Sequence, residues 1–312
     1  MHHFSSEVLV DLFTPLEIIE IVKNGIKKYA EGKYKVPERM HLSRGESTNL
    51  IMPAFGDNYY CTKLISVDPN NTKHDLPVIS GLLVLNDSTT GEPLATMDAP
   101  TITALRTGAV GSIGLDLICE KEVTRLGIIG LGVQGLWQSI FASSIRNITN
   151  IFCYSRSTTS FKSYRQKIKT SFPNLEVTWC NSSEEVVNES EIVIACTTSK
   201  NPVFDANALE LSSKRFVSVG SFAKDMQELP DQIYLDAEAL ILDAEAARNE
   251  VGDVINTLKS KWISPNDIHT LADLANNKMA ISNYKNIVFK SVGMAAFDLA
   301  LAEAVYNKHR FK

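Results

Sequence analysis

Residues 125–139 hold the pattern that most restricts the fold of this chain. The segment RLGIIGLGVQGLWQS begins as an apolar, β-branched run and continues as a helix-like stretch. Between them Gly130, Gly132 and Gly135 are spaced as G-x-G-x-x-G. In this spacing the first glycine permits a tight turn, the second lets the backbone approach a pyrophosphate, and the third lets the helix pack on the strand. The N–H groups at the helix start then face the phosphates. The pattern predicts a strand–turn–helix unit that binds a dinucleotide, with a tight turn that binds nothing as its alternative.

The chain around this motif alternates short apolar runs with helix-like stretches, as parallel strands joined by crossover helices do. We expect helices near 136–147 and 182–190 and strands at 125–130, 150–155, 175–180, 191–197, 215–220 and 239–244. Right-handed crossovers would wind these strands into a Rossmann-type sheet. The expected fold class is therefore α/β.

The two ends of the chain have other patterns. Residues 7–32 are typical of a strand followed by an amphipathic helix, and 76–99 of two strands joined by a glycine-containing turn. Near the other end, a strand-like run at 287–293 precedes a helix-like stretch at 294–309. We expect this last helix to pack on the N-terminal lobe. Residues 1–114 and 294–312 would then form a smaller α+β domain, into which a Rossmann domain, 115–293, is inserted.

Charge and composition restrict the partners. A net charge of −5 argues against a nucleic-acid or anionic-membrane partner, so we expect a small-molecule substrate. The widely spaced cysteines, without a C-x-x-C pair, indicate reduced thiols rather than a disulfide or zinc framework, and no metal site is expected. No apolar run reaches the roughly 18 residues of a membrane span, and no signal-peptide pattern opens the sequence. We therefore expect a cytoplasmic protein.

The end of the second expected strand bears on the choice of nucleotide. Sites that prefer NAD usually place Asp or Glu there to accept a hydrogen bond from the ribose 2′-hydroxyl. This chain instead has Ser155, Arg156 and Ser157. A guanidinium flanked by hydroxyls suits a 2′-phosphate. We expect NADPH as the cofactor, with NADH as a weaker possibility, whereas a merely solvated arginine would carry no preference.

Three cations in the N-terminal part are candidates for ligand binding. They are Arg39, Lys63 and Arg106. Lys63 and Arg106 each lie in an apolar or small-residue stretch, where burying an unpaired charge is costly unless a ligand or an acid matches it. Each alone would more commonly be a surface charge.

Several longer segments resemble motifs of the ornithine cyclodeaminase/mu-crystallin family. They are MPA (52–54), TKL (62–64), TGEPLATMDAPTITALRTGAVGSIG (90–114), GIIGLGVQG (127–135), DAEAARNEVGDV (243–254) and VFKSVGMAAFD (288–298). The resemblance covers nearly the whole chain. It implies a homodimer formed through the N-terminal lobe, and an active site between that lobe and the nucleotide domain.

The same resemblance implies roles for individual residues. Arg39, Lys63 and Arg106 would bind a substrate carboxylate, with Lys63 and Arg106 as the catalytic residues. Asp298 of the GMAxxD motif would organise the last helix. The implied cofactor contacts, beside the three glycines and the 155–157 run, are Thr107, Val133, Gln134, Thr197, Gly220, Ser291 and Gly293.

One loop departs from the cyclodeaminase pattern. Cyclodeaminases have GGDxPGKxEL after the fifth strand, and the Asp engages the substrate amine. This chain reads GSFAKDMQEL at 220–229, with Phe222 at the Asp position. Asp225 could replace that acid only on a different backbone path, and Phe222 could instead be an ordinary core residue. The pattern is similar to that of family members that reduce Δ1-pyrroline-2-carboxylate and Δ1-piperideine-2-carboxylate. With such a substrate, Phe222 would contact the ring methylenes.

Reduction of a preformed cyclic imine needs no group that moves protons on a free amine. The sequence therefore favours an NADPH-dependent ketimine reductase that transfers hydride to the imine carbon and yields L-proline or L-pipecolate. One alternative is an ornithine cyclodeaminase or an alanine-type amino-acid dehydrogenase. Another is an NADPH-dependent small-molecule binding protein of the mu-crystallin type. Glu250, Asp253 and water are the candidate proton donors.

Overall fold

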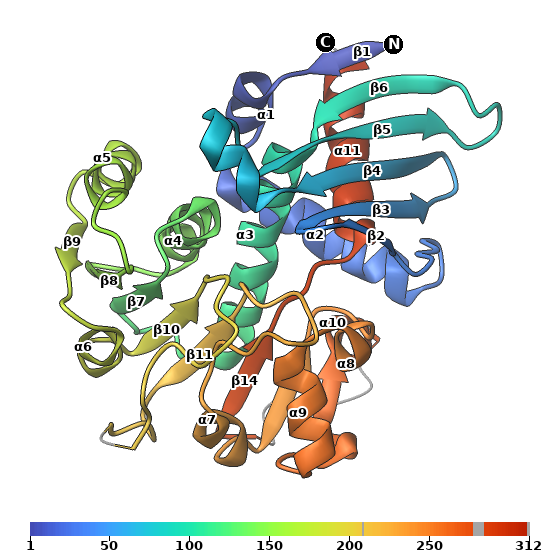
Figure 1. Ribbon diagram of the computed structural model, residues 1–312. Helices are drawn as coiled ribbons and strands as arrows, with labels where there is room; N and C mark the ends of the chain where they lie inside the picture. Colours follow the sequence, from blue (N-terminus) through green and yellow to red (C-terminus); the bar gives the residue numbers. More distant parts are fainter. Residues whose placement is uncertain (208, 277–283, 311–312) are drawn as a thin grey trace. The chain divides into compact units, whose positions relative to one another are not determined.

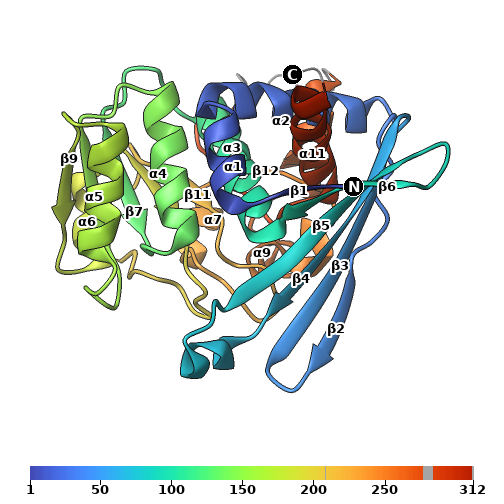
Figure 2. The ribbon, with the colours of Figure 1, turned by 90° about the horizontal axis from the view of Figure 1, so that it is seen from above.

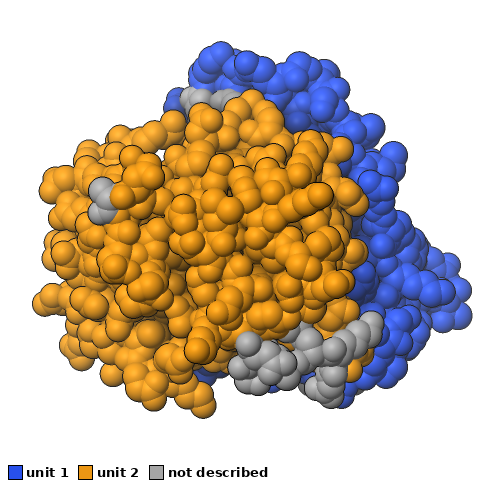
Figure 3. Space-filling view, turned by 90° about the horizontal axis from the view of Figure 1, so that it is seen from below, with its two compact units in different colours: residues 1–106, 294–312 blue, residues 107–293 orange. Residues whose placement is uncertain are grey.

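The computed structural model describes residues 1–207, 209–276 and 284–310, and the chain forms two compact units, coloured separately in Figure 3. Unit 1 consists of Met1–Arg106 and Met294–Lys312, and unit 2 of Thr107–Gly293. The division falls within helix α3 (Ala99–Ile118), earlier than the boundary at 114/115 that we expected. Residues 277–283 and 311–312 of the two expected domains lie outside the described residues.

Unit 1 is built on a six-stranded sheet of order β1-β6-β5-β4-β3-β2 (Figure 1). Neighbouring strands are antiparallel except β1, which runs parallel to β6. The two strands expected within 76–99 are confirmed as β5 and β6. The strands are β1 (His2–Phe4), β2 (Met40–Arg44), β3 (Ser47–Phe55), β4 (Tyr59–Val67), β5 (Ile79–Asp87) and β6 (Pro93–Asp98), with a 3-10 turn at Pro69–His74.

Besides residues 99–106 of α3, the described part of unit 1 contains the helices α1 (Ser6–Leu12), α2 (Pro15–Ala30) and α11 (Ala295–Arg310). The prediction of a strand at the start of 7–32 is wrong, because that segment forms α1. His2–Phe4 already take the place beside β6, and α1 buries Leu9 alone. A capping box between Thr14 and Glu17 starts α2. Helix α11 packs closely on α2, since a Cβ at Gly25 would lie 2.6 Å from the Cβ of Ala300.

Unit 2 is built on an eight-stranded parallel sheet of order β13-β12-β14-β11-β10-β7-β8-β9. The run β9-β8-β7-β10-β11 has the strand order of a Rossmann fold, which confirms the expected α/β class. The six strands expected between residues 125 and 244 are all present, each shorter than expected, and the strand-like run at 287–293 contains β14. The strands are β7 (Arg125–Ile129), β8 (Asn150–Tyr154), β9 (Glu176–Trp179), β10 (Ile192–Ala195), β11 (Arg215–Ser218), β12 (Ala239–Leu242), β13 (Ile268–Thr270) and β14 (Ile287–Lys290).

Helices cover both faces of this sheet, as buried parallel strands require. In Figure 1, α4 (Val133–Ile145) and α5 (Phe161–Ser171) lie on one side of β7 and β8, and α6 (Ser183–Glu189) on the other. Figure 2 shows α4 and α5 side by side from above. The other helices are α7 (Asp231–Leu235), α8 (Ala247–Glu250), α9 (Gly252–Ser260) and α10 (Leu271–Ala275), with a 3-10 turn at Pro265–Asp267.

The interior of unit 2 is apolar, and every residue of β10, β12 and β14 is buried. The five cysteines of the chain form no disulfide, and four of them are buried. Within the described ranges, no helix combines the length and the apolar character that crossing a membrane would need.

Candidate active site

The glycine motif forms the turn between β7 and α4. Gly130 has a φ of 101°, in the region that favours glycine, and its N–H donates to the carbonyl of Tyr154 at 2.9 Å. A side chain at Gly135 would overlap the carbonyl oxygen of Gly130, so only glycine lets α4 pack this closely on the turn. At Gly132, by contrast, an added Cβ would meet no atom within 4 Å. The backbone at this glycine is therefore open to a ligand.

The start of α4 fits the pyrophosphate of a dinucleotide. Gly132 occupies the N-cap position and, having no side chain, does not cap the N–H groups of the first turn. Val133 is 64% exposed, and the buried Oε1 of Gln134 has no hydrogen-bond partner among the described residues. The carbonyl of Thr107, another predicted contact, accepts from the buried Gln138 of α4 at 2.8 Å and so ties α3 to this helix. Helix N-termini of this kind bind phosphate groups.

The three residues expected at the adenosine ribose follow β8 directly. Arg156 and Ser157 are exposed, and Ser155 is partly exposed. The Ser157 hydroxyl bonds that of Thr159 at 2.7 Å, which shapes the turn. In the described part of the chain no ion pair occupies Arg156, so its guanidinium is available to a ligand.

Two of the predicted cations meet a single carboxylate in unit 1. Lys63 on β4 and Arg106 on α3 are both buried, and Asp298 on α11 pairs with them at 2.7 Å (Lys63 Nζ to Oδ2) and 3.1 Å (Arg106 Nε to Oδ1). Lys63 also donates to the hydroxyl of Thr103 at 3.2 Å. Asp298 thus does more than organise the last helix, because it is the counterion of both cations.

The electrostatics of this cluster favour an added anion. Burial lowers the pKa of Lys63 from 10.5 to about 8; the charge of Asp298 opposes this, while Arg106 and the half-buried Arg39 add to it. Among the described residues, Arg106 makes a side-chain hydrogen bond through Nε alone. Its Nη groups therefore remain free for the bidentate contact that a carboxylate makes with arginine.

In unit 2, the carboxylate of Glu228 joins the ends of β10 and β11. It accepts from the N–H and hydroxyl of Thr197 at 2.5 and 2.9 Å, and from the N–H groups of Gly220 and Ser221 at 2.6 and 3.1 Å. The Ser218 hydroxyl donates to it at 3.0 Å. Glu228 thus holds two predicted cofactor contacts, Thr197 and Gly220. The sequence pattern of the 220–229 loop gives this acid no role of its own.

Asp243 has a similar role beside β14. Its carboxylate accepts from the Ser291 hydroxyl and the Gly293 N–H, both at 2.7 Å, and from the N–H of Val292 at 3.0 and 3.1 Å. Gly293 has a φ of 81°, which explains why glycine stands there. Ser291 and Gly293, two of the implied cofactor contacts, therefore share one buried acid.

The loop after β11 carries Phe222. Its side chain is 43% exposed, so the interpretation of this residue as part of the core is wrong. Asp225 forms an exposed ion pair with Lys200 at 2.6 Å instead of standing in for the missing acid.

Asp253, a candidate proton donor, is fully buried and bonded to the hydroxyls of Ser221 and Tyr234, which leaves it out of reach of a ligand. Glu250, the other candidate, closes the short helix α8 and is partly exposed.

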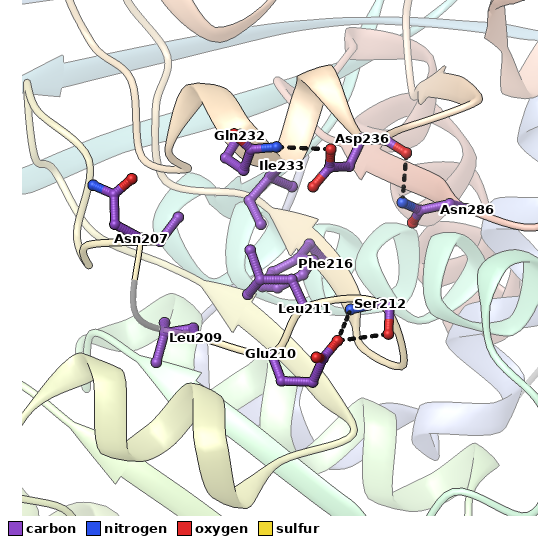
Figure 4. Close-up of a pocket in the computed structure, with 11 residues that line it drawn as sticks. Asn207, Leu209, Glu210, Leu211, Ser212, Phe216, Gln232, Ile233, Asp236 and Asn286 are labelled. Carbon is purple, nitrogen blue, oxygen red and sulfur yellow. Dashed lines mark hydrogen bonds between the residues drawn. The ribbon is translucent and has the colours of Figure 1, made fainter.

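A hollow of about 570 Å³ lies elsewhere in unit 2, beside β11 and α7 (Figure 4). Its polar side chains are already paired: Gln232 with Asp236, Asn286 with the Asp236 carbonyl, Glu210 with Ser212, and Asn207 with Asp205 outside the lining. The predicted site residues do not line it. We therefore base the functional argument on the two sets of residues above.

Comparison with known proteins gives a consistent result. The sequence pattern of the ornithine cyclodeaminase/mu-crystallin family matches residues 1–312. A Delta(1)-pyrroline-2-carboxylate reductase of Bacillus thuringiensis subsp. konkukian (strain 97-27) is 30% identical over 302 residues, 94% of this chain and 91% of that protein. An alanine dehydrogenase of Archaeoglobus fulgidus is 28% identical over 317 residues, 97% of this chain and 93% of that protein. Thermococcus litoralis Delta(1)-pyrroline-2-carboxylate reductase, solved in complex with NADH and L-proline, aligns with a TM-score of 0.92 and 30% identity over 100% of this chain and 98% of that chain.

Proposed function

This chain belongs to the ornithine cyclodeaminase/mu-crystallin family, and we propose that it is an NADPH-dependent reductase of cyclic ketimine carboxylates. It would reduce Δ1-pyrroline-2-carboxylate to L-proline and Δ1-piperideine-2-carboxylate to L-pipecolate. The observation that carries the proposal is the exposed, apolar Phe222 at the position where the cyclodeaminase pattern has an acid. A site without that acid suits a substrate whose nitrogen is already part of a ring.

The substrate carboxylate would be bound by the cation cluster of unit 1. The free Nη groups of Arg106 would make the bidentate contact, and the protonated Lys63 would add a second charge. Asp298 holds both cations in place. Anchoring one end of a small molecule in this way fixes the position of its reacting carbon, which can supply much of a rate enhancement.

The bond changes need little else from the chain. When bound, the reduced nicotinamide supplies the hydride that adds to the imine carbon. The imine nitrogen carries its proton into the site, since the protonated form is the better electrophile, and becomes the secondary amine of the product. Phe222 would contact the ring methylenes, and its lack of charge leaves the iminium free of a competing ion pair.

The preference for NADPH rests on the turn after β8. Arg156 is exposed, has no ion-pair partner in the described ranges and is flanked by the hydroxyls of Ser155 and Ser157, which supports recognition of a 2′-phosphate. The residues that would hold the pyrophosphate are those of the glycine turn and the start of α4.

A homodimer through the sheet of unit 1 is part of the proposal. Met40, Ile51, Leu64 and Leu82 are paired in register across β2, β3, β4 and β5, so they share one face. Lys63 belongs to the opposite, buried face. Met40, Leu64 and Leu82 are each about half exposed, and a continuous apolar row of this kind supports association with a second copy. Analytical ultracentrifugation tests this part, and a monomer would contradict it.

The test of the function is a substrate panel. NADPH and NADH oxidation are followed with the two cyclic imines and with pyruvate plus ammonia, and ammonia release is followed with ornithine and NAD⁺. We expect turnover of the imines with NADPH well above the other combinations. Ammonia release from ornithine at a comparable rate would overturn the proposal, and so would tight NADPH binding without turnover of either imine.

A further inference from the structure

A buried polar network surrounds Ser221, the residue just before Phe222. Lys290 on β14 is fully buried, and its ammonium donates to the hydroxyl of Ser218 at 3.0 Å, the carbonyl of Ser221 at 2.9 Å and the hydroxyl of Ser221 at 2.6 Å. These three bonds use all of its N–H groups. Asp253 on α9, also fully buried, lies 3.9 Å from the Lys290 ammonium and supplies the opposite charge.

Every polar group of Ser221 is engaged. Its N–H donates to Glu228, its carbonyl accepts from Lys290, and its hydroxyl accepts from Lys290 while donating to Asp253. The preceding Gly220 N–H is held by Glu228 as well. The next residue in the chain, Phe222, points its side chain out of the core. Fully satisfied buried networks are rigid, so the direction in which Phe222 leaves the backbone is fixed.

We propose that Lys290, Asp253 and Ser221 are positioning residues, which hold Phe222 where it contacts the substrate ring and thereby set the affinity for the cyclic imine. The inference rests on the proposed function, and it goes further by naming three residues that touch neither substrate nor cofactor. Glu228 differs from them, because it also holds Thr197 at the end of β10.

Ser221→Ala is the first variant to test. It removes the hydroxyl that joins Lys290 to Asp253, but leaves the backbone bonds to Glu228 and Lys290 in place. Tyr234→Phe is the matched control, because the Tyr234 hydroxyl donates to the same Asp253 carboxylate at 2.6 Å and is bonded to no part of Ser221. A merely structural network would respond to both changes alike. If Ser221→Ala does not fold, Ser221→Cys takes its place, since a thiol is a weaker hydrogen-bonding group of similar shape and leaves the charges of Lys290 and Asp253 in place.

Steady-state kinetics then separate positioning from general damage. We expect Ser221→Ala to raise the imine KM roughly fivefold to tenfold, as the loss of one hydrogen bond would, with the NADPH KM unchanged. Tyr234→Phe should change the imine KM by less than about twofold. In a Phe222→Ala background, Ser221→Ala should have no further effect, because its influence passes through that side chain. Additive effects, or an equal response to Tyr234→Phe, would overturn the proposal.

Hydrogen–deuterium exchange of the peptide 219–226 gives a readout that does not depend on turnover. We expect Ser221→Ala to exchange faster there than the wild type, and Tyr234→Phe to match the wild type. If the wild-type protein reduces neither imine, the proposed function fails while this measurement still decides the positioning role. Unchanged protection in Ser221→Ala would then count against it.

Discussion

Replacing Asp298 by Asn tests whether the cation cluster is built around this carboxylate. Asp298 is fully buried and pairs with the buried Lys63 and Arg106 at 2.7 and 3.1 Å. Asn preserves the volume, so the change removes the charge without opening a cavity. Removing one partner of a buried ion pair typically costs about 3–5 kcal/mol, because the other charge is left uncompensated. Since two cations lose their counterion here, we expect a loss of unfolding free energy within or above that range.

The measurement is urea unfolding at pH 7, followed by two signals. The three tryptophans, Trp137, Trp179 and Trp262, all lie in unit 2, so their fluorescence follows that unit, whereas far-UV circular dichroism follows both. The variant should lose stability first in the circular dichroism signal. Glu303→Gln on the same helix is the control: Glu303 accepts from Tyr34 and pairs with a Lys28 side chain that is 44% exposed, so its loss should be smaller.

The pH dependence gives a sharper check. Asp298 raises the pKa of Lys63 against the effect of burial, so in Asp298→Asn this pKa falls below the wild-type value of about 8. Lys63 then loses its proton at a lower pH than in the wild type, and the neutral amine no longer repels the Arg106 guanidinium. The destabilisation should therefore shrink as the pH rises toward 8. A loss below about 1 kcal/mol at pH 7, or a loss that grows with pH, would refute the argument.

Three further predictions follow from the site. Arg156→Ala should raise the NADPH KM about 10- to 100-fold, because it removes a charged hydrogen bond to the 2′-phosphate, and should change the NADH KM little. An equal effect on both nucleotides would contradict a phosphate contact. The kcat/KM for the imine should fall as the pH rises through about 8, where Lys63 loses its charge, and Lys63→Arg should move that fall to higher pH if the charge binds the substrate. Phe222→Asp should weaken imine reduction and introduce binding of a diamine acid, measured by calorimetry; unchanged imine kinetics without diamine binding would show that position 222 does not decide the reaction.

The parts of the fold that could be predicted are those determined by residues close together in the sequence. The strands from β7 to β12 are short apolar runs, and Gly130, Gly132 and Gly135 specify their own turn whatever the rest of the chain does. The segment EVLV at 7–10 shows the limit of such reasoning. Its apolar residues fit a short strand as well as one turn of helix, and only the pairing of His2–Phe4 with β6 decides between them.

The network around Lys290 was not predicted, because its contacts depend on the order of the strands in the sheet. Strand β14 is the last in the sequence but lies between β11 and β12, and this placement brings Lys290 against Ser218 and Ser221. No spacing in the sequence gives that contact. A signal did exist, however: a lysine in the apolar strand IVFK needs a partner, by the same reasoning that identified Lys63 and Arg106.

Two almost fully buried lysines, Lys63 and Lys290, show how a positioning cation differs from a binding one. Lys290 gives all three N–H groups to protein oxygens and has a buried carboxylate nearby, so the folded chain satisfies it completely. In the described part of the chain, Lys63 donates to the Thr103 hydroxyl and shares the Asp298 carboxylate with Arg106, whose Nη groups make no side-chain hydrogen bond there, and burial lowers the pKa of Lys63 to about 8. The cluster around Asp298 therefore lacks one negative charge, and a substrate carboxylate would supply it. Burial alone does not distinguish the two lysines, whereas the count of satisfied N–H groups and counterions does.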